Sequence, residues 1–326
     1  MDSTIFRAIQ PPLLGHVASP LRVAVLYGGH SAERAVSLES GRTVAQALAA
    51  AGHEVALFDT ADVPWTEWPW QRVDVAYIAL HGGAGEDGRV QAALEQLDIP
   101  YTGSGPAASR LAMSKSASKE RFAAAGVPTP DYALVHRDDS PPQIVARARH
   151  LGGRLVVKPD SQGSSLGVGL AERPRDVPPL LAASAALDEF VLLERYVAGR
   201  ELTVALLGRE VLPVVEIAAP GGWFDYDAKY RSPRTIVCCP ADLPADREKS
   251  VRDVALAAAE CLDTRGLVRV DVRLDHRGQP WVLEVNTVPG MTDHSLAPRA
   301  AAAAGIDLPA LCDRQVYEAL SVGAGG

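Results

Sequence analysis

The stretch VRVDVRLDHRGQPWVLEVNTVPGMTDHSL, residues 268–296, decides the expected fold of this chain. Two runs within it, VRVDVRL and PWVLEVN, alternate in polarity, and the link between them contains the turn-forming Asp275 and Gly278. This pattern predicts a β-hairpin. A hairpin with its charges facing water is the simplest interpretation. It does not explain why an Arg, an Asp, a Glu and an Asn all lie within otherwise apolar strands, nor does it explain the following loop with its Pro289-Gly290 pair.

The polar residues of this hairpin are of the types that bind a metal and a phosphate. Side chains alternate across a strand, so Arg269 and Asp271, together with Arg273, share one face. Glu284 and Asn286 share a face of the returning strand. If the two faces coincide, Asp271, Glu284 and Asn286 form a cluster of oxygen ligands, which suits Mg²⁺ held jointly with substrate phosphates. With Arg269 beside it as a fixed cation, such a cluster can transfer phosphoryl groups from ATP.

Composition indicates a globular enzyme of two or three domains. The chain has 326 residues, of which 47% are hydrophobic and 22% are charged, as is ordinary for such proteins. Its formal net charge of -8 argues against the basic surface of a nucleic-acid-binding protein. None of the four cysteines belongs to a CxxC motif, so we expect reduced thiols and a cytoplasmic protein. We expect no membrane span, because no apolar run reaches about 18 residues, and we interpret residues 1–20 as a loose extension without a signal-peptide core.

The N-terminal part alternates strands, Gly-rich turns and a helix, which is typical of a parallel α/β sheet. The predicted elements are strands at 21–26, 55–58 and 73–80, and a helix at 32–51 with Ser31 as its N-cap and Gly52 after its end. The loops GGHSAER and HGGAGEDG follow the first and third strands, at the edge where such sheets bind ligands. Alone, Glu33 is an acid favoured at a helix start, and His81 is a lone histidine of a kind that is usually structural. Because both lie at this edge, we favour functional roles for them.

The remaining elements are predicted from apolar runs and turn residues. They are a helix at 114–125, strands at 155–158 and 191–196, a hairpin about Gly208 between strands 201–207 and 211–217, a helix at 245–262 and a closing helical region at 298–320. The loop 163–169, which includes Ser164 and Ser165, can present backbone N–H groups to phosphates. A flexible turn is the alternative, since the loop is neither a Walker A loop nor a Rossmann fingerprint. Lys158, before the loop, favours phosphate binding, because a Lys can reach phosphates as a point charge.

Two glutamates and a long loop complete the candidate site. Glu194 and Glu201 flank a short strand and turn, where solvated surface glutamates and a nucleotide pocket are equally good interpretations. In the second, backbone groups of residues 195–197 would read the adenine edge and a carboxylate would bind the ribose hydroxyls. The loop 221–234 is long and rich in aromatic residues, so we interpret it as a lid that closes over the reacting groups.

Five motifs in this order resemble those of the D-alanine–D-alanine ligases, members of the ATP-grasp superfamily. They are GGHSAERAVSLESG, HGGAGEDG, KPDSQGSSLGVG, FDYDAKY and RVDVRL…LEVNTVPGMTDHSL, and the resemblance covers about residues 21–320. It implies an α/β fold that is α+β in its ATP-grasp part. After the extension at 1–20, an N-terminal parallel, Rossmann-like substrate domain would occupy 21–109. A two-part ATP-grasp domain would follow, with a central subdomain at 110–200 and a C-terminal subdomain, holding the metal site and lid, at 201–326.

The resemblance also implies a reaction and its cofactors. ATP phosphorylates the carboxylate of one D-alanine, and the amine of a second D-alanine attacks the acyl phosphate. D-alanyl-D-alanine, a peptidoglycan precursor, forms together with ADP and phosphate. Two Mg²⁺ (or Mn²⁺) would be bound by Asp271, Asn286 and a bridging Glu284. The residues implied to bind ATP are Lys115, Lys158, Ser164, Ser165, Glu194, Val197, Glu201 and Lys229, the last approaching the transferred phosphoryl group.

Further residues are implied to bind and activate the amino acids. Those at the two substrates are Glu33 and His81 for the first D-alanine, and Ser295 and Leu296 for the second. The resemblance implies an oxyanion hole made by Arg269 and the backbone N–H of Gly290. It also implies a hydrogen-bonded triad that ties the lid to the substrate site, made by Glu33, Ser164 and Tyr230.

Other functions remain to be separated from this one. The nearest is an ATP-grasp ligase for D-serine or D-lactate, although Tyr230 favours an amine nucleophile, because relatives that make D-alanyl-D-lactate typically carry His or Phe there. A nucleotide-binding module without catalysis would be expected to lack one of the four polar hairpin residues. A hydride-transferring Rossmann enzyme would carry GxGxxG where this chain has GGHSAER. The family resemblance further implies a homodimer, with neither nucleic acid nor membrane as a partner.

Overall fold

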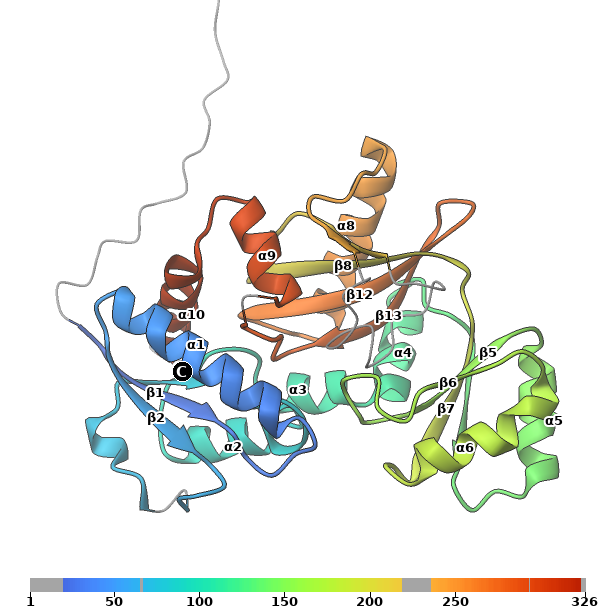
Figure 1. Cartoon of the computed structure of the whole chain (residues 1–326), viewed down its shortest axis with the longest axis horizontal. Coiled ribbons are helices and arrows are strands. Elements are labelled where there is room, and N and C mark those ends of the chain that lie inside the picture. The colour runs from blue at the N-terminus through green and yellow to red at the C-terminus, as the bar shows by residue number, and fades with distance from the viewer. Residues whose placement is uncertain (1–19, 65–66, 219–235, 293, 324–326) are drawn as a thin grey trace, which may run out of the picture.

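The strands of this chain form three separate sheets. A computed structural model describes residues 20–64, 67–218, 236–292 and 294–323, so nearly all of the N-terminal extension and the whole predicted lid loop lie outside the described residues. Within the described chain the sheets have three, four and six strands, in the orders β2-β1-β3, β4-β7-β5-β6 and β11-β10-β8-β12-β13, with β9 paired to β8. Figure 1 shows the third sheet between the first and the second, with the last helix returning to the first sheet.

The first sheet is parallel, as the sequence predicts. Its elements are β1 (Arg22–Tyr27), α1 (Arg34–Ala50), β2 (Glu54–Asp59), η2 (Trp70–Arg72), β3 (Val75–Ile78), η3 (Gly83–Gly85) and α2 (Arg89–Gln96). The prediction of Ser31 as N-cap of α1 is wrong, because the helix begins after Glu33. Ser31 Oγ instead accepts a hydrogen bond from the Glu33 N–H and donates one to the carbonyl of His81. Gly52, with a φ of +96°, follows the last helical turn as expected.

Asp59, at the end of β2, fixes the turn that carries the chain from β1 into α1. Its Oδ1 accepts hydrogen bonds from the Gly29 and Ala61 N–H groups at 3.1 and 3.0 Å, and Arg34 pairs with the same carboxylate. Burial raises the pKa of this carboxyl, but the hydrogen bonds from Arg34, Ala61 and Gly29 outweigh it and lower the pKa to about 2. The carboxylate therefore stabilises the fold only while it is ionised.

We expect Asp59→Asn to lower the free energy of unfolding by about 2 kcal/mol at pH 7, the usual worth of a hydrogen bond to a charged group. Because the folded pKa, about 2, lies below the ordinary value of 3.8, the stabilisation is complete above pH 4 and is lost as the pH falls from about 4 to 2. Urea unfolding across this range tests the idea, with exposed Asp62→Asn as control. An unchanged gap between wild type and Asp59→Asn at pH 7 and pH 2 would contradict it.

The second sheet is antiparallel and is covered by helices on one side. Its elements are β4 (Tyr132–His136), α5 (Pro141–Leu151), β5 (Leu155–Pro159), β6 (Gly169–Ala171), η4 (Pro174–Asp176), α6 (Val177–Ala185) and β7 (Phe190–Arg195). The helices before it in the chain, α3 (Pro106–Met113) and α4 (Lys115–Ala124), pack against the third sheet. The start of α4 is tied to the end of β5, because Asp160 accepts hydrogen bonds from Ser114 Oγ and the Ser116 N–H, both at 2.7 Å. This junction sets where Lys115 enters the molecule.

The third sheet contains the hairpin that opened the sequence. Its elements are β8 (Gly199–Leu207), β9 (Glu210–Val211), β10 (Val215–Ala218), β11 (Ile236–Cys238), α8 (Ala245–Cys261), β12 (Leu267–Asp275), β13 (Pro280–Asn286), α9 (Leu296–Ala303) and α10 (Leu308–Gly323). The predicted turn at Gly208, whose φ is +58°, is confirmed, although its returning strand is split into β9 and β10. Helix α8 packs its alanines and valines on the apolar side of β8, β12 and β13.

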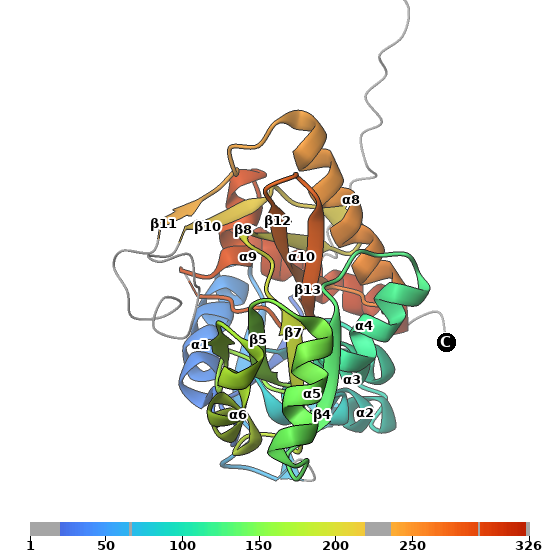
Figure 2. The same ribbon diagram turned by 90° about the vertical axis from the view of Figure 1, so that its right-hand side faces the viewer.

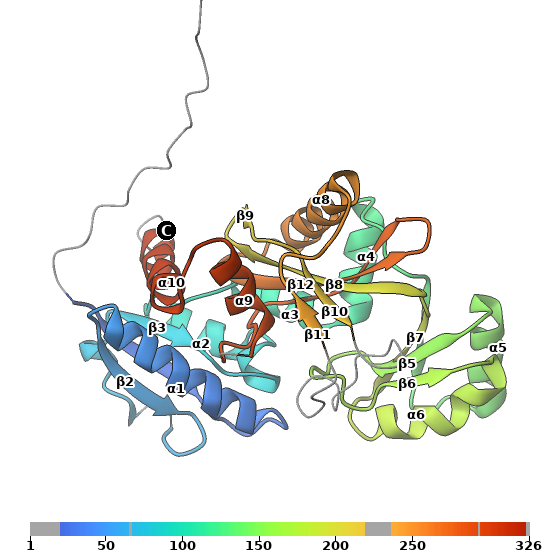
Figure 3. The same ribbon diagram turned by 45° about the horizontal axis from the view of Figure 1, so that its top comes forward.

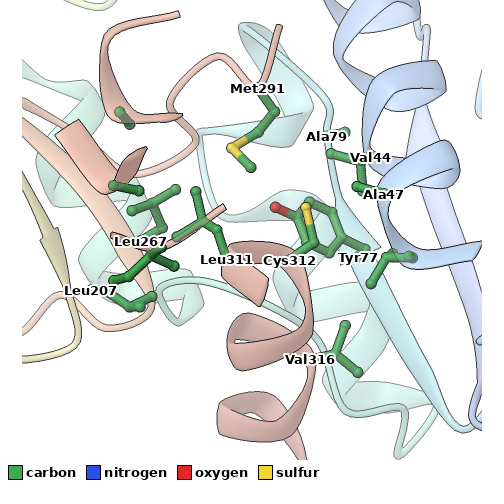
Figure 4. Packing of buried hydrophobic residues seen from close by; sticks show 14 of the residues in the cluster. Val44, Ala47, Tyr77, Ala79, Leu207, Leu267, Met291, Leu311, Cys312 and Val316 are labelled. Carbon is green, nitrogen blue, oxygen red and sulfur yellow. The ribbon is translucent and has the colours of Figure 1, made fainter. Parts of the chain in front are cut away.

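The largest core joins the first sheet to the C-terminal helices. Tyr77 of β3 lies among Val44 and Ala47 of α1 and Leu311 and Cys312 of α10, together with residues of the third sheet (Figure 4). Figure 3 shows α10 and α1 over the same sheet. The opposite face of that sheet packs against Trp70 and α2. No helix within the described residues is long and apolar enough to cross a lipid bilayer.

Candidate functional site

A pocket between the second and third sheets brings together part of the predicted site. Its empty space is about 800 Å³, including the opening to solvent. Eight of the predicted site residues line it: Lys115, Lys158, Ser165, Glu194, Val197, Glu201, Asp271 and Glu284. They come from β5, β7, β8, β12, β13 and the segments beside these strands, which Figure 2 shows stacked one sheet above the other.

The polar faces of the two hairpin strands coincide, which is the condition on which the predicted metal site depends. Arg269 lies opposite Asn286 and Asp271 lies opposite Glu284 in the β12–β13 ladder, so each pair projects to the same side. Arg269 binds Asp271 through two hydrogen bonds, from Nε at 2.9 Å and from Nη2 at 2.8 Å. Thr203 Oγ1, on the neighbouring β8, donates to Asp271 Oδ1 at 2.7 Å. The carboxylate of Asp271 is thereby fixed in direction.

An irregularity in this ladder was not predicted. The register shifts after the pair of Asp271 and Glu284, because Val272 lies opposite Val282 and Leu283 is the extra residue. Such a β-bulge re-aims side chains locally. As a result Leu283 and Glu284 both line the pocket, although they are consecutive in the strand. An apolar side chain thus lies next to the acidic one.

Two lysines and one glutamate form a buried charge cluster behind the pocket. Glu194 is 2% exposed, and its two oxygens lie 2.9 Å from Lys158 Nζ and 2.6 Å from Lys119 Nζ. Burial raises the pKa of Glu194, but the charges of Lys119 and Lys158 outweigh it, so the pKa is lowered. Burial lowers the pKa of Lys119 to about 8. The cluster carries one positive charge in excess while all three groups are ionised, and Lys158 and Glu194 face the pocket.

Lys115 links the second sheet to the acidic side of the pocket. Its Nζ donates to the carbonyl of Gln162 at 2.7 Å and lies 3.4 Å from Glu284 Oε2. The Lys115 N–H donates to the carbonyl of Asp160 at 3.0 Å, so both ends of the residue are anchored to the chain after β5. This chain continues into the Gly-rich loop that the sequence assigns to phosphates.

Residues 196–201 connect the two sheets, and we call them the nucleoside segment because the resemblance implies that they face the nucleoside of ATP. Glu201 Oε2 and the carbonyl of Val197 both accept hydrogen bonds from Arg273, at 2.9 and 3.1 Å. Arg273 shares a strand face with Asp271, as alternation predicts, and both residues line the pocket. The sequence therefore contained a signal for Arg273, although it gave no indication of what this residue binds.

Glu33 and Ser164 are brought together from distant parts of the chain. Ser164 Oγ donates to Glu33 Oε2 at 2.6 Å. A Cβ on the neighbouring Gly163 would lie 2.5 Å from Glu33 Oε1, so a larger residue there would displace the Glu33 carboxylate from this position. Ser164 and Ser165 both have positive φ, 52° and 55°, which non-glycine residues seldom adopt. The loop is thus held in a strained conformation against the first sheet.

His81 connects the first sheet to the loop after β13. It is 4% exposed, and its Nδ1 and Nε2 lie 3.0 Å from the carbonyl of Val288 and 2.9 Å from Ser40 Oγ. Ser40 Oγ also accepts from the Met291 N–H. A neutral ring with its proton on Nδ1 satisfies all three contacts, because Nδ1–H then donates to the carbonyl and Nε2 accepts from Ser40. His81 therefore positions the loop that contains Gly290.

Gly290 and Ser295 face each other across a tight turn before α9. A Cβ on Gly290 would lie 2.8 Å from Ser295 Oγ. Ser295 Oγ accepts from the Thr292 N–H at 3.0 Å, and Leu296 begins α9 directly after it. Lys229 and Tyr230, the remaining predicted residues, lie outside the described residues. The partners that sequence reasoning missed are Lys119, Asp160, Thr203 and Ser40. Asp160 and Ser40 lie within two of the quoted motifs but were given no role, and Lys119 and Thr203 belong to none of those motifs.

The donor set for a metal is small and made of oxygen. Within the described residues there is no cluster of three or more His, Cys, Asp and Glu side chains. Two carboxylates and one carboxamide, those of Asp271, Glu284 and Asn286, lie on one face of the hairpin instead. Such hard ligands fit Mg²⁺ or Mn²⁺, which take further ligands from water and substrate phosphates. They do not fit a structural zinc site, which is built mainly from sulfur and nitrogen.

Comparisons with known proteins agree with one another. A family model described as "D-ala D-ala ligase C-terminus" matches residues 122–317, and one described as "D-ala D-ala ligase N-terminus" matches residues 66–104. The D-alanine--D-alanine ligase of Alkalilimnicola ehrlichii is 44% identical over 293 residues, which are 90% of this chain and 93% of that protein. The enzyme of the same name from Bordetella petrii is 45% identical over 302 residues, 91% of this chain and 92% of its own.

Solved structures give the same picture. The D-alanine--D-alanine ligase from Bacillus anthracis complexed with ATP superposes with a TM-score of 0.82 at 32% identity, covering 93% of this chain and 99% of that one. The ligase from Coxiella burnetii has a TM-score of 0.79 at 23% identity, covering 93% and 96%, and shows the shared fold alone.

Proposed function

The chain belongs to the D-alanine–D-alanine ligase family, and from this membership we propose how its own residues join two D-alanines with ATP. The observation that carries the proposal is the direct pairing of Asp271 with Glu284 in a pocket that also holds Lys115 and Lys158. Acids for a metal and cations for phosphates are the parts that phosphoryl transfer needs. The overall reaction forms D-alanyl-D-alanine, ADP and phosphate, as a step of peptidoglycan precursor synthesis.

In the first step a carboxylate oxygen of one D-alanine attacks the γ-phosphorus of ATP. The bond from the γ-phosphorus to the β–γ bridging oxygen breaks, and D-alanyl phosphate and ADP form. Lys115 and Lys158 hold the phosphates, and backbone N–H groups near Ser164 and Ser165 close over them. Lys229, in the lid, approaches the transferred group. The excess positive charge of the Lys119–Glu194–Lys158 cluster supports this placement of the phosphates, because it is buried beside the pocket.

Asp271, Glu284 and Asn286 would hold two Mg²⁺ (or Mn²⁺), with Glu284 shared between them. Bound there, the metals would offset the negative charge of the phosphates during transfer. Arg269 and Lys115 already pair with Asp271 and Glu284, so both carboxylates are oriented by the protein itself. Arg269 keeps this position in the second step.

In the second step the amine of the other D-alanine attacks the acyl carbon. Negative charge develops on the carbonyl oxygen, where Arg269 and the Gly290 N–H stabilise it, and phosphate leaves as the tetrahedral intermediate collapses. His81 supports this role indirectly, since it binds the loop that contains Gly290. Ser295 and Leu296 contact the attacking D-alanine. Glu33 accepts hydrogen bonds from the ammonium group of the first.

The lid completes the site in this proposal. Ser164 donates a hydrogen bond to Glu33. In the proposal Tyr230, which lies outside the described residues, would complete this pair to a triad at the first D-alanine, and its phenol would favour an amine over D-lactate as nucleophile. The division into domains at residues 109 and 200 belongs to the same proposal. We also propose that the enzyme is a cytoplasmic homodimer, which sedimentation analysis of the full chain tests.

The deciding experiment measures phosphate release from ATP with Mg²⁺ and D-alanine, with the product identified by mass. We expect D-alanine-dependent release with the mass of the dipeptide, none with L-alanine, and no depsipeptide when D-lactate is added. Release with D-serine or D-lactate as the favoured second substrate would keep the ATP site and refute the assignment of the nucleophile. No release with any of these acids would refute the proposed reaction.

A further inference from the structure

Arg273 is the one arginine side chain that lines the pocket from strand β12, and the mechanism above gives it no role. Its side chain is 6% exposed, so its charge is held largely away from water. The register of β12 against β8 sets it directly opposite Glu201, just as Asp271 lies opposite Thr203. One strand therefore carries both an acid for the metal and a cation at another part of the pocket.

The guanidinium of Arg273 binds three different groups of the nucleoside segment. Nε donates to the carbonyl of Val197 at 3.1 Å, Nη1 to Glu201 Oε2 at 2.9 Å, and Nη2 to the phenol oxygen of Tyr196 at 2.8 Å. A guanidinium is planar, with its donors in a fixed fork. These three acceptors are consequently held in a fixed arrangement relative to one another and to strand β12.

Tyr196 extends this arrangement to the second sheet. Its ring centroid lies 5.3 Å from Arg273 Cζ and 4.6 Å from Arg154 Cζ, and its N–H donates to the carbonyl of Arg154 at 3.0 Å. Arg154 precedes β5, the strand that ends near Lys158. Arg273 thus connects the sheet with the acidic hairpin to the sheet that carries the phosphate-binding lysine.

We propose that Arg273 is a positioning residue for the nucleoside part of ATP. It directs the ionised carboxylate of Glu201 toward the ribose hydroxyls and holds the Val197 backbone at the edge of the base. The inference rests on the proposed placement of ATP, in which Glu201 meets the ribose and Val197 the adenine. An ionised carboxylate only accepts hydrogen bonds, so its alignment decides whether both ribose hydroxyls can donate to it. Arg273 acts on ATP through these neighbours.

The test compares the KM for ATP and for 2′-deoxy-ATP in wild type, Arg273→Met and Arg273→Lys. We expect Arg273→Met to raise the KM for ATP about tenfold, a typical loss for a charge-assisted hydrogen bond. The kcat and the KM for D-alanine should change less than twofold, because Arg273 supports ATP binding equally in the ground state and the transition state and does not touch the reacting atoms. The preference for ATP over the 2′-deoxy nucleotide should shrink. Lys keeps one charge but not the fork, so its KM should be intermediate.

Arg154→Met is the matched control. Like Arg273, Arg154 places a guanidinium beside the ring of Tyr196, but Arg154 does not line the pocket. Its KM for ATP should equal that of wild type. A double-mutant cycle with Glu201→Gln separates action through Glu201 from a general loss of packing, since linked residues give non-additive effects. Additive effects, or an Arg273→Met KM for ATP within twofold of wild type, would overturn the proposal.

Failure of the proposed reaction can be distinguished from failure of the proposal for Arg273. The reaction is refuted if the wild-type protein binds ADP with Mg²⁺ in a calorimeter but does not consume D-alanine. The ADP dissociation constant of Arg273→Met then still measures the role of Arg273, with a tenfold increase expected and an unchanged value overturning it.

Discussion

Replacing Glu284 by Gln is expected to lower kcat about a thousandfold, within the range found when one stabilising group is removed from a transition state. Glu284 lies opposite Asp271 and 3.4 Å from Lys115. The amide keeps the shape of the side chain but removes the charge that would offset the two proposed metals and that holds Lys115 in place. Phosphate release at saturating ATP and D-alanine measures the effect. A titration with Mg²⁺ should also show a higher half-saturation concentration.

Glu216→Gln is the control for this change. Glu216 belongs to the same sheet and is also paired with a cation, Arg200, but it does not line the pocket. Its kcat should stay within twofold of wild type. Turnover at the wild-type rate in Glu284→Gln would refute the metal assignment, because no other glutamate of the described hairpin faces the pocket.

The second large effect is expected from Lys119→Met, as a loss of about 3 kcal/mol in the free energy of unfolding. Lys119 is fully buried, and its Nζ contacts Glu194 Oε2 and Thr129 Oγ1, both at 2.6 Å. Without it, the buried carboxylate of Glu194 keeps Lys158 as its only cation. Urea unfolding measures the loss. The KM for ATP should rise as well, because Lys158 is then neutralised by Glu194 and attracts phosphates less.

A double variant distinguishes this charge effect from lost packing. Lys119→Met with Glu194→Gln removes the buried carboxylate that has lost one of its two cations, and Lys158 is then no longer neutralised by Glu194. Part of the stability and a lower KM for ATP should therefore return. Lys249→Met, at a lysine that is exposed and pairs with Asp253 on the surface, should cost less than about 0.5 kcal/mol. If the double variant is less stable than Lys119→Met alone, the explanation by charge is wrong.

Local patterns carried the parts of the fold that depend on neighbours in sequence. Alternation in 268–274 and 280–286 grouped Arg269 with Asp271 and Glu284 with Asn286, but it left open whether these two faces coincide, and an unbroken register from the turn would have set Asp271 opposite Leu283 instead of Glu284. It could not reveal the bulge at Leu283, since the pairing of two strands, and not the order of residues in one, decides where a residue is left over. The helices α5 and α6 escaped prediction because each begins with consecutive prolines, Pro141-Pro142 and Pro178-Pro179, which suggest a loop.

In the candidate site, too, local sequence patterns indicated single residues but not the contacts between residues far apart in the chain. Lys158 and Glu194 were singled out separately from their positions at strand ends, but their contact with each other joins residues 36 apart. Lys119 lies in the same helix as the predicted Lys115, but no motif singles it out, and its role depends on its contact with Glu194 of β7. Ser31 was expected as an N-cap because its residue type favours one. The hydrogen bond of its hydroxyl to the carbonyl of His81 depends on the third strand, which no local rule includes.

The order in which the ribosome makes this chain bears on the packing of its first sheet. Strands β1 and β3 emerge early, yet Tyr77 and its neighbours on that face are covered partly by α10, which begins at Leu308. Until those last turns are synthesised, the apolar face stays incompletely shielded, and such surfaces attract chaperones and proteases. A nascent chain arrested before Leu308 should therefore be digested within its first sheet by a protease that leaves the released protein intact.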